Sequence, residues 1–426
     1  MPEKFIINGG KPLEGEIEVR GAKNAAFPIL AASLLTHQEC EISNLPLIED
    51  LFRMIEILKS MGVEVTWQGE RTIKIRAKDL DPSKIKEDLV LLFRGSVLLL
   101  GSLLARFGKA KLPQPGGCII GVRPIDTHLD AFSQLRAKTD FEDNHFQLEI
   151  HRPFKNQTVI LNEFSVTATE NIMLFAGLNP GRIVIKTADI DYQVQELAKF
   201  LRKMGVKIKG IGTHALTIEG AKKLKGAKHR LINDPIEAGT FILTGATARG
   251  KVLIKNVELP FLEFLLKKIK DFGVPFKISH QQSGRGQVQI FPWESLKIDK
   301  IQSLPYPGIP SDLQSAFGVL ATQSPGSTLI HDPLYEGRLK YLEELTKMGA
   351  EIYFADPHRA IINGPTQLYG RNIKSLDLRG GAALIMAGLI ARGQTTIENI
   401  YQIDRGYERI EERLQKLGAD IKRIST

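Results

Sequence analysis

The chain repeats one pattern six times, and this repeat limits its possible folds more than any other feature. Each copy is a helical stretch that ends at a glycine and runs into a short strand-like stretch. The clear copies lie at 57–67, 201–210, 269–278, 345–354 and 414–423. A weaker copy at 134–142 has Arg136 at the glycine position, and the marker positions are 68 to 76 residues apart. Glycine after helical periodicity is typical of a helix C-terminus, because the left-handed conformation costs it little.

Each repeat begins with an apolar helix and a short strand, as in FPILAASLL (27–35) before CEISN (40–44). These first helices are apolar nearly all round, so we expect them to be buried, whereas the second helices are amphipathic. A solenoid is an alternative, but buried first helices favour two closed α/β domains with helices inside. We expect three repeats in 22–232 and three in 1–21 plus 233–426. The first residues resemble a hairpin that belongs to one half.

The composition is that of an ordinary soluble protein, with 426 residues, 43% hydrophobic and 25% charged. Two cysteines make no disulfide framework, which predicts a reducing cytoplasm. The first residues lack a signal-peptide pattern, and the uncharged stretches are too short to cross a bilayer, so we expect no membrane insertion. The net charge of +9 is dispersed and lacks interleaved aromatic residues. It indicates attraction of small anions and no nucleic-acid partner.

Polar residues gather at two places in the repeat, just before the first helix and just before the second. The first set comprises Lys23, Asn24, Arg94, 165–170, Glu237, Asp312, Asp377 and Arg379, and the second comprises Glu49, Asp50, 118–128, 189–193, Glu258, 336–338, Asp404 and Arg405. Helix N-termini suit phosphates and carboxylates, and arginine binds both with two hydrogen bonds. If both halves turn these ends inward, they form a cleft for polyanions. The alternative is that the acidic residues are only helix caps and the arginines surface residues.

The segment LPQPGGCIIGVRPIDTHLD (112–130) reads as a loop because of its prolines and glycines. It places Cys118 beside Arg123, where the pKa of a thiol can fall. A buried structural cysteine is the alternative. The histidines and cysteines show no metal-ligand spacing and no GxxxxGK[ST] phosphate loop is present, so we expect neither metal nor cofactor.

Five motifs together resemble the enolpyruvyl transferase family over essentially the full length: GAKNAA (21–26), 112–130, YPGIPSDLQ (306–314), DLRGGAAL (377–384) and IDRGYERIEERL (403–414). The resemblance implies an α/β fold of two inside-out α/β barrel domains, each of three βαβαββ-like units, with the first strand region in the C-terminal domain. It also implies transfer of the enolpyruvyl group of phosphoenolpyruvate to the 3-hydroxyl of UDP-N-acetylglucosamine, with release of phosphate, in peptidoglycan synthesis.

The resemblance further implies residue roles. Asp312 takes the proton of the attacking hydroxyl, and Cys118 is a general acid on a lid that can form a phosphoenolpyruvate adduct. Lys23 and Arg405 complete the catalytic set. The implied substrate-binding residues are Lys23, Asn24, Arg94, Arg123, Pro124, Ile125, Asp126, Thr127, His128, Ser165, Val166, Thr167, Asp312, Leu334, Arg338, Arg379 and Arg405.

The chain departs from the common pattern of the family mainly on the acceptor side. Glu163 stands where a lysine is frequent, 191–193 replaces Glu-Pro-Glu, and Pro235 and Leu91 each replace an arginine. One alternative acceptor is shikimate 3-phosphate, although the Cys118 loop and RPIDTH (123–128) argue against it. Another alternative is a non-catalytic paralogue that binds nucleotide sugar. The sequence does not indicate the oligomeric state.

Overall fold

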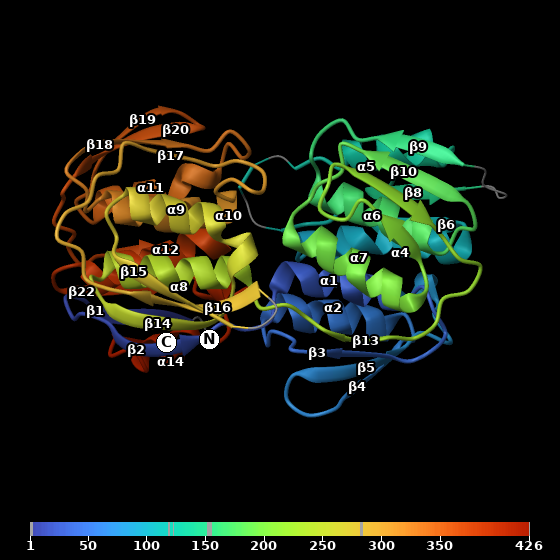
Figure 1. Cartoon of the computed structure of the whole chain (residues 1–426), viewed down its shortest axis with the longest axis horizontal. Helices are drawn as coiled ribbons and strands as arrows, with labels where there is room; N and C mark the ends of the chain where they lie inside the picture. The colour runs from blue at the N-terminus through green and yellow to red at the C-terminus, as the bar shows by residue number, and fades with distance from the viewer. Residues whose placement is uncertain (1–2, 118–119, 122, 151–155, 282–283, 426) are drawn as a thin grey trace. The chain divides into compact units, whose positions relative to one another are not determined.

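The computed structural model describes residues 3–117, 120–121, 123–150, 156–281 and 284–425 (Figure 1). These residues form two compact units. We call 3–20, 120–121 and 233–425 the terminal unit, and 21–117 and 123–232 the inserted unit. Residues 120–121, which the predicted boundaries place with 22–232, belong to the terminal unit, where Ile120 O accepts a hydrogen bond from Gly337 N at 2.8 Å.

The six markers of the repeat share one backbone conformation. At positions 62, 205, 273, 349 and 418 glycine has φ between 84° and 109°. Arg136, in the weak copy, has φ 65°, so the same left-handed turn forms there without glycine. The predicted sixfold repeat is therefore confirmed.

A complete repeat reads strand, helix, strand, helix, strand, strand. The fifth repeat consists of β17 (Lys300–Gln302), α10 (Ser311–Ala321), β18 (Gly326–His331), α11 (Tyr341–Lys347), β19 (Glu351–Asp356) and β20 (Arg359–Gly364). Its strands form one sheet in the order β17-β18-β20-β19, in which only β17 and β18 are parallel. This is the βαβαββ unit expected from the resemblance.

The two N-terminal strands do not pair with each other, so the hairpin prediction is wrong. β1 (Glu3–Asn8) lies between β22 (Gln394–Glu398) and β23 (Asp420–Ser425). β2 (Glu14–Glu18) pairs in parallel with β14 (Lys251–Glu258) and so supplies the first strand of the fourth repeat. The strand that precedes this repeat in the chain, β13 (Lys228–Arg230), instead pairs with β3 (Cys40–Ser43) of the first repeat.

The remaining elements follow the same plan. The inserted unit also contains α1 (Lys23–Ser33), α2 (Glu49–Ser60), β4 (Glu64–Trp67), β5 (Thr72–Arg76), α3 (Glu87–Val90), α4 (Leu99–Phe107), β6 (Lys109–Pro113), α5 (Asp126–Gln134), β7 (Lys138–Glu142), β8 (His145–Glu149), β9 (Gln157–Ile160), α6 (Val166–Gly177), β10 (Arg182–Lys186), α7 (Tyr192–Met204), β11 (Lys207–Lys209) and β12 (Ala215–Glu219). The terminal unit also contains α8 (Pro235–Thr247), α9 (Glu263–Asp271), β15 (Phe276–His280), β16 (Arg285–Ile290), β21 (Asn372–Lys374), α12 (Leu378–Ile390), α13 (Tyr401–Asp404) and α14 (Ile410–Gln415).

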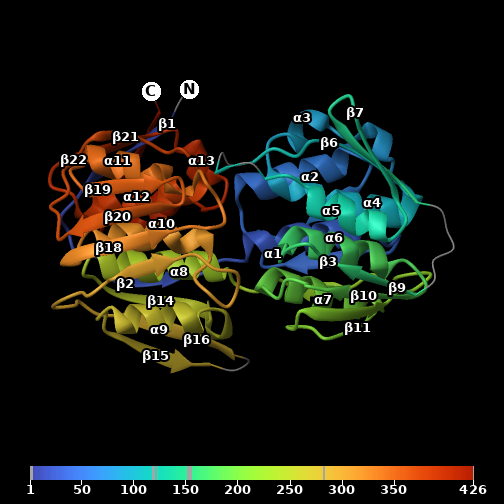
Figure 2. The ribbon, with the colours of Figure 1, turned by 90° about the horizontal axis from the view of Figure 1, so that it is seen from above.

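The first helices of the repeats form the core of each unit, as predicted. Every residue of α8 is buried, and so is every residue of α12 except its last. The helices α8, α10 and α12 pack against one another in the terminal unit, and α1, α4 and α6 do so in the inserted unit. In Figures 1 and 2 the sheets of each unit lie around these helices. Each unit therefore contains three buried helices, each with its own N-terminus.

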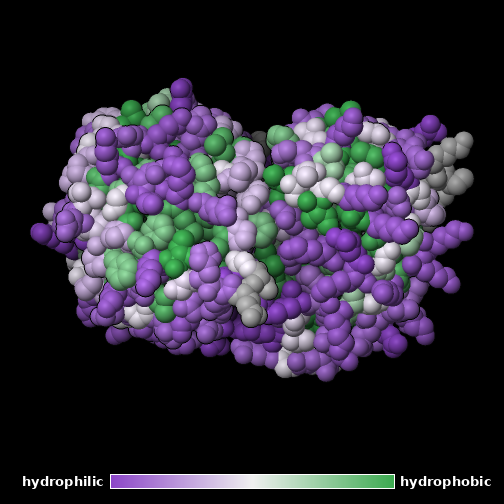
Figure 3. All heavy atoms as spheres, viewed as in Figure 1, coloured by the Kyte–Doolittle hydropathy of each residue, from purple (hydrophilic) through white to green (hydrophobic). Residues whose placement is uncertain are grey.

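Hydrophilic side chains cover most of the face shown in Figure 3, and smaller apolar groups appear between them. Among the described residues, no helix has both the length and the hydropathy needed to cross a bilayer.

Candidate active site

Asp312 lies in the first turn of α10 and is held by two arginines of the terminal unit. Arg338 Nη2 is 3.0 Å from Asp312 Oδ1, and Arg379 Nε is 3.0 Å from Oδ2. The Asp312 side chain keeps 29% of its surface exposed, whereas each arginine side chain keeps 3%. The partly exposed Asp312 carboxylate therefore bridges two buried guanidinium groups, each of which donates to one of its oxygens.

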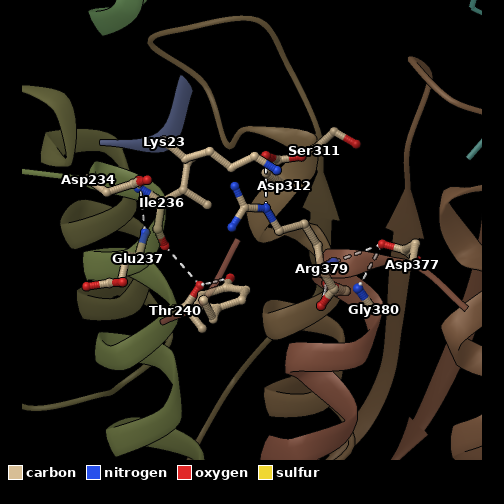
Figure 4. Close-up of polar contacts among 12 residues, drawn as sticks. Lys23, Asp234, Ile236, Glu237, Thr240, Ser311, Asp312, Asp377, Arg379 and Gly380 are labelled. Carbon is tan, nitrogen blue, oxygen red and sulfur yellow. Dashed lines mark hydrogen bonds and ion pairs between the residues drawn. The ribbon is translucent and has the colours of Figure 1, made fainter. Parts of the chain in front are cut away.

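A second carboxylate, that of Asp377, lies at the N-terminus of α12 beside Arg379 (Figure 4). Asp377 is the N-cap residue, and its Oδ1 accepts hydrogen bonds from Arg379 N at 2.9 Å and Gly380 N at 3.0 Å. The same oxygen is 3.5 Å from Arg338 Nη1. The side chain of Asp377 therefore caps α12 and also positions the guanidinium group of Arg338.

Arg338 is further oriented by a buried hydroxyl–carboxylate pair. Its Nε donates to Ser311 Oγ at 2.9 Å, and Ser311 Oγ donates to Asp332 Oδ2 at 2.6 Å. Burial lowers the pKa of Arg338, but the negative charges of Asp312 and Asp377 outweigh it and leave this pKa above its ordinary value. The guanidinium is thus permanently charged and fixed in direction.

Arg379 is supported by the elements that flank α12. Its guanidinium carbon lies 5.2 Å from the centroid of the Tyr407 ring, which favours a cation–π interaction. The Tyr407 hydroxyl is 2.8 Å from Thr240 Oγ1 of α8. Figure 4 shows Thr240 one turn beyond Ile236, whose backbone N donates to the cap residue Asp234 at 2.8 Å.

Two other predicted residues of the terminal unit have different surroundings. Arg405 is buried and donates from Nη1 to Gln402 Oε1 at 3.0 Å. Leu334 has an exposed side chain, and its backbone N donates to Asp332 Oδ1 at 3.1 Å. Leu334 therefore adds an apolar surface next to the buried Asp332.

In the inserted unit, Lys23 begins α1 and forms a buried ion pair. Its Nζ is 2.8 Å from Asp50 Oδ2, at the start of α2, and Arg53 Nη1 is 3.3 Å from Asp50 Oδ1. Asn24, the next residue of α1, is half-buried. Lys23 and Arg53 therefore share the Asp50 carboxylate.

A second cationic pair adjoins the proline–glycine loop. Arg94 Nη2 donates to Pro124 O at 2.8 Å. Gly117 has φ 138°, and a Cβ added there would lie 2.5 Å from Arg123 Nη2 and 3.2 Å from Arg94 Cβ. Glycine is therefore needed for the backbone to lie this close to both arginines. The predicted acid Cys118 lies outside the described residues.

The N-termini of α5 and α6 are linked by side-chain hydrogen bonds. Thr127 Oγ1 donates to Glu163 Oε1 at 3.0 Å, and Thr167 Oγ1 is 3.0 Å from His128 Nε2. Ser165 caps α6 by accepting from Ala168 N at 3.4 Å. Val166 is half-buried, Ile125 is buried, and Pro124 and Asp126 are exposed. The structure therefore brings His128 and Thr167 together, and brings Arg94 to Pro124.

Burial, and then the positive charge of Arg94, lower the pKa of His128 to about 3. The ring is therefore neutral at neutral pH, with one nitrogen as a donor and the other as an acceptor.

Sequence reasoning missed several residues that orient the predicted ones: Asn171, Ser311, Asp332 and Tyr407. Ser311 and Tyr407 lie inside motifs that carry the resemblance, beside Asp312 and Arg405, so position in the motif is a signal for both. Asp332 follows a strand and precedes a proline, which is an ordinary turn pattern. Asn171 stands in an apolar helix, where a polar residue with no exposed surface needs a partner.

Comparison with known proteins gives matches along nearly the whole chain. The family model for EPSP synthase (3-phosphoshikimate 1-carboxyvinyltransferase) matches residues 7–414. A protein of Treponema denticola named UDP-N-acetylglucosamine 1-carboxyvinyltransferase is 40% identical over 98% of this chain and 99% of its own length. A protein of the same name from Halothermothrix orenii is 41% identical over 99% of both chains.

Two solved structures are similar in fold. The enolpyruvyl transferase NikO from Streptomyces tendae has a TM-score of 0.89 at 24% identity, with 100% of this chain and 99% of that chain covered. EPSP synthase from Acinetobacter baumannii has a TM-score of 0.74 at 17% identity, with both chains covered completely.

Proposed function

Because the chain belongs to the enolpyruvyl transferase family, we propose that it transfers the enolpyruvyl group of phosphoenolpyruvate to the 3-hydroxyl of UDP-N-acetylglucosamine and releases phosphate. This is the UDP-N-acetylglucosamine 1-carboxyvinyltransferase reaction, the first committed step of peptidoglycan synthesis. The observation that carries the proposal is the 40% identity to a protein of that name over 98% of the chain.

Asp312 is the proposed general base. Its half-exposed carboxylate takes the proton of the 3-hydroxyl while the hydroxyl oxygen forms a bond to C2 of phosphoenolpyruvate. The hydrogen bonds from Arg338 and Arg379 hold this carboxylate in a fixed direction.

Cys118 is the proposed general acid. Its thiol proton passes to the methylene carbon of phosphoenolpyruvate, which becomes a methyl group in a tetrahedral intermediate. In the second step the Cys118 thiolate takes a proton back from the methyl group, the C2–C3 double bond forms again, and the C2–O bond breaks with its electron pair leaving on phosphate. One base and one acid are therefore sufficient for the addition and the elimination.

The proposed cations for the donor are Lys23, Arg123 and Arg405, with Arg94, Arg338 and Arg379 in support. A trianionic donor requires several fixed positive charges. The ion pair of Lys23 and the side-chain hydrogen bonds of Arg338 and Arg379 hold these groups in defined directions. The proposed acceptor side comprises Asn24, 123–128, 165–167 and Leu334.

The acceptor side carries the main departure from the family pattern. Glu163 accepts a hydrogen bond from Thr127 and so adds a negative charge at the N-terminus of α5. It stands where a lysine is frequent in the family, so the charge on this part of the proposed acceptor side is reversed. We propose the cytoplasm as the location, which fits two cysteines without a disulfide framework.

Phosphate release from phosphoenolpyruvate tests the proposal, measured with UDP-N-acetylglucosamine and separately with shikimate 3-phosphate. We expect release only with the nucleotide sugar, and a product heavier by one enolpyruvyl group in the mass spectrum. Release only with shikimate 3-phosphate would refute the proposed acceptor. Binding of UDP-N-acetylglucosamine without turnover would indicate the non-catalytic paralogue instead.

A further inference from the structure

His128 has both ring nitrogens engaged, and its partners determine which nitrogen carries the proton. Nδ1 is 2.9 Å from Asn171 Nδ2, and Nε2 is 3.0 Å from Thr167 Oγ1. The ring is buried, with 3% of the residue exposed, whereas Thr167 is half-buried. The network therefore runs from the core of the inserted unit to the surface at the start of α6.

Two backbone groups fix the orientation of the Asn171 amide. Gly101 N donates to Asn171 Oδ1 at 2.8 Å, and Asn171 Nδ2 donates to Val97 O at 3.1 Å. An N–H group can only donate and a carbonyl can only accept, so a flipped amide would break both hydrogen bonds. Asn171 therefore presents an N–H group to His128 Nδ1.

The state of His128 follows from this orientation. Nδ1 faces a donor, so it has to be the acceptor. A neutral imidazole has one acceptor and one donor, which leaves the proton on Nε2. The low pKa of about 3 agrees with a neutral ring. Nε2–H then donates to Thr167 Oγ1, and the hydrogen of the Thr167 hydroxyl has to point to another acceptor.

We propose that His128 is a positioning residue that holds the Thr167 hydroxyl as a hydrogen-bond donor to an anionic oxygen of the acceptor nucleotide sugar. The inference rests on the proposed function, because it names what Thr167 does in that acceptor site. The N-terminus of α6 adds its partial positive charge at the same place, which favours a phosphate oxygen as the partner.

The first test is the affinity for UDP-N-acetylglucosamine, measured by titration calorimetry and as KM. Thr167→Val keeps the shape of the side chain and removes the hydroxyl. A hydrogen bond to a charged group corresponds to an affinity loss of about 10- to 100-fold. We expect Thr167→Val to lose this much affinity for UDP-N-acetylglucosamine but not for phosphoenolpyruvate. Thr167→Ser should lose less affinity for UDP-N-acetylglucosamine. The matched control is Thr158→Val, an exposed Thr→Val change on β9 in the same unit.

The second test couples the two residues. His128→Leu should weaken acceptor binding in the parent enzyme but not in the Thr167→Val background, because the hydroxyl that it positions is then absent. His128→Gln, which restores an N–H group, should recover part of the loss. Additive losses in the double variant would overturn the inference and leave His128 a structural residue.

A third measurement needs no variant. Nitrogen-15 spectra of the imidazole distinguish the Nε2–H tautomer from the Nδ1–H tautomer and from the cation. We expect the neutral Nε2–H form of His128 throughout the neutral range, and either other form would overturn the inference. Failure of the proposed function would instead appear as parent enzyme that releases no phosphate with UDP-N-acetylglucosamine.

Discussion

The carboxylate of Asp312 is both a partner of two buried arginines and the proposed base. Asp312→Asn keeps the size of the side chain but cannot take a proton, so we expect kcat to fall by about 10²- to 10⁴-fold. Phosphate release measures this effect, and thermal unfolding checks the fold. Asp299→Asn, at an exposed position of the same unit, is the control. A near-parental rate for Asp312→Asn would show that another group acts as the base.

Cys118 is tested by the chemistry of its replacement. A carboxylic acid can donate a proton, whereas a methyl group cannot, so Cys118→Asp should keep measurable phosphate release and Cys118→Ala should lose most of it. The two variants are compared in the same assay at the same enzyme concentration. Equal rates would eliminate the acid role of the thiol.

Glu170 of α6 makes the stability of the protein depend on pH. Burial, followed by the charges of Asp189 and Asp191, raises its pKa well above the ordinary value of 4.5. Above about pH 4.5, and up to the raised pKa, Glu170 keeps its proton in the folded chain and loses it in the unfolded chain. The free energy of unfolding therefore falls as the pH rises through this range. Glu170→Gln removes this cost, and we expect its Tm to exceed the parental Tm by a margin that grows from about pH 5 to pH 8.

The control for this experiment is Glu219→Gln, at an exposed position on β12. Its Tm should follow that of the parent at each pH. Parallel curves for Glu170→Gln and the parent would mean that Glu170 does not hold the extra proton.

At the scale of elements, the Asp377 side chain at the start of α12 has two roles. Asp377 caps the helix and balances Arg338. Asp377→Ala loses both, and we expect a decrease in the free energy of unfolding of about 2 kcal/mol or more. Asp377→Asn can still accept the backbone hydrogen bonds and should lose less. Urea denaturation measures both, and equal losses would show that the cap contributes nothing.

The sequence predicted the helices and their order well, because a glycine at each helix end and an apolar first helix are local signals. It failed for β1 and β2. Two short strands separated by a few residues suggest a hairpin, but β1 and β2 instead pair with strands more than 200 residues away. Burial against distant neighbours decides strand pairing, and no local pattern contains that information.

The candidate site was predictable to a similar depth. The arginines at 338 and 379 and the carboxylate at 312 stand out as charged residues at helix starts. Asn171 and Asp332 do not, because their roles depend on which buried groups they meet in three dimensions. The order in which His128, Asn171 and Gly101 contact one another is visible only in the folded chain.

At the scale of the whole molecule, the net charge of +9 favours the approach of the two proposed substrates, which are both anions. We expect kcat/KM for phosphoenolpyruvate to fall several-fold when KCl is raised from about 20 mM to about 300 mM, because salt screens the attraction. Sucrose at matched osmolality is the control for effects other than screening. A salt-independent kcat/KM would show that the distributed charge does not steer the donor.

The pairing of β1 with β22 and β23 also has a consequence for synthesis on the ribosome. All residues of the inserted unit lie between 21 and 232, so it can fold while the rest of the chain is being translated. The terminal unit cannot complete its folding during this time, because β1 pairs with β23, with Glu3 opposite Ser425. At about 5–20 residues per second, β1 remains without its partners for tens of seconds. The inserted unit can therefore fold during translation, whereas the terminal unit can complete its folding only after β23 has been made.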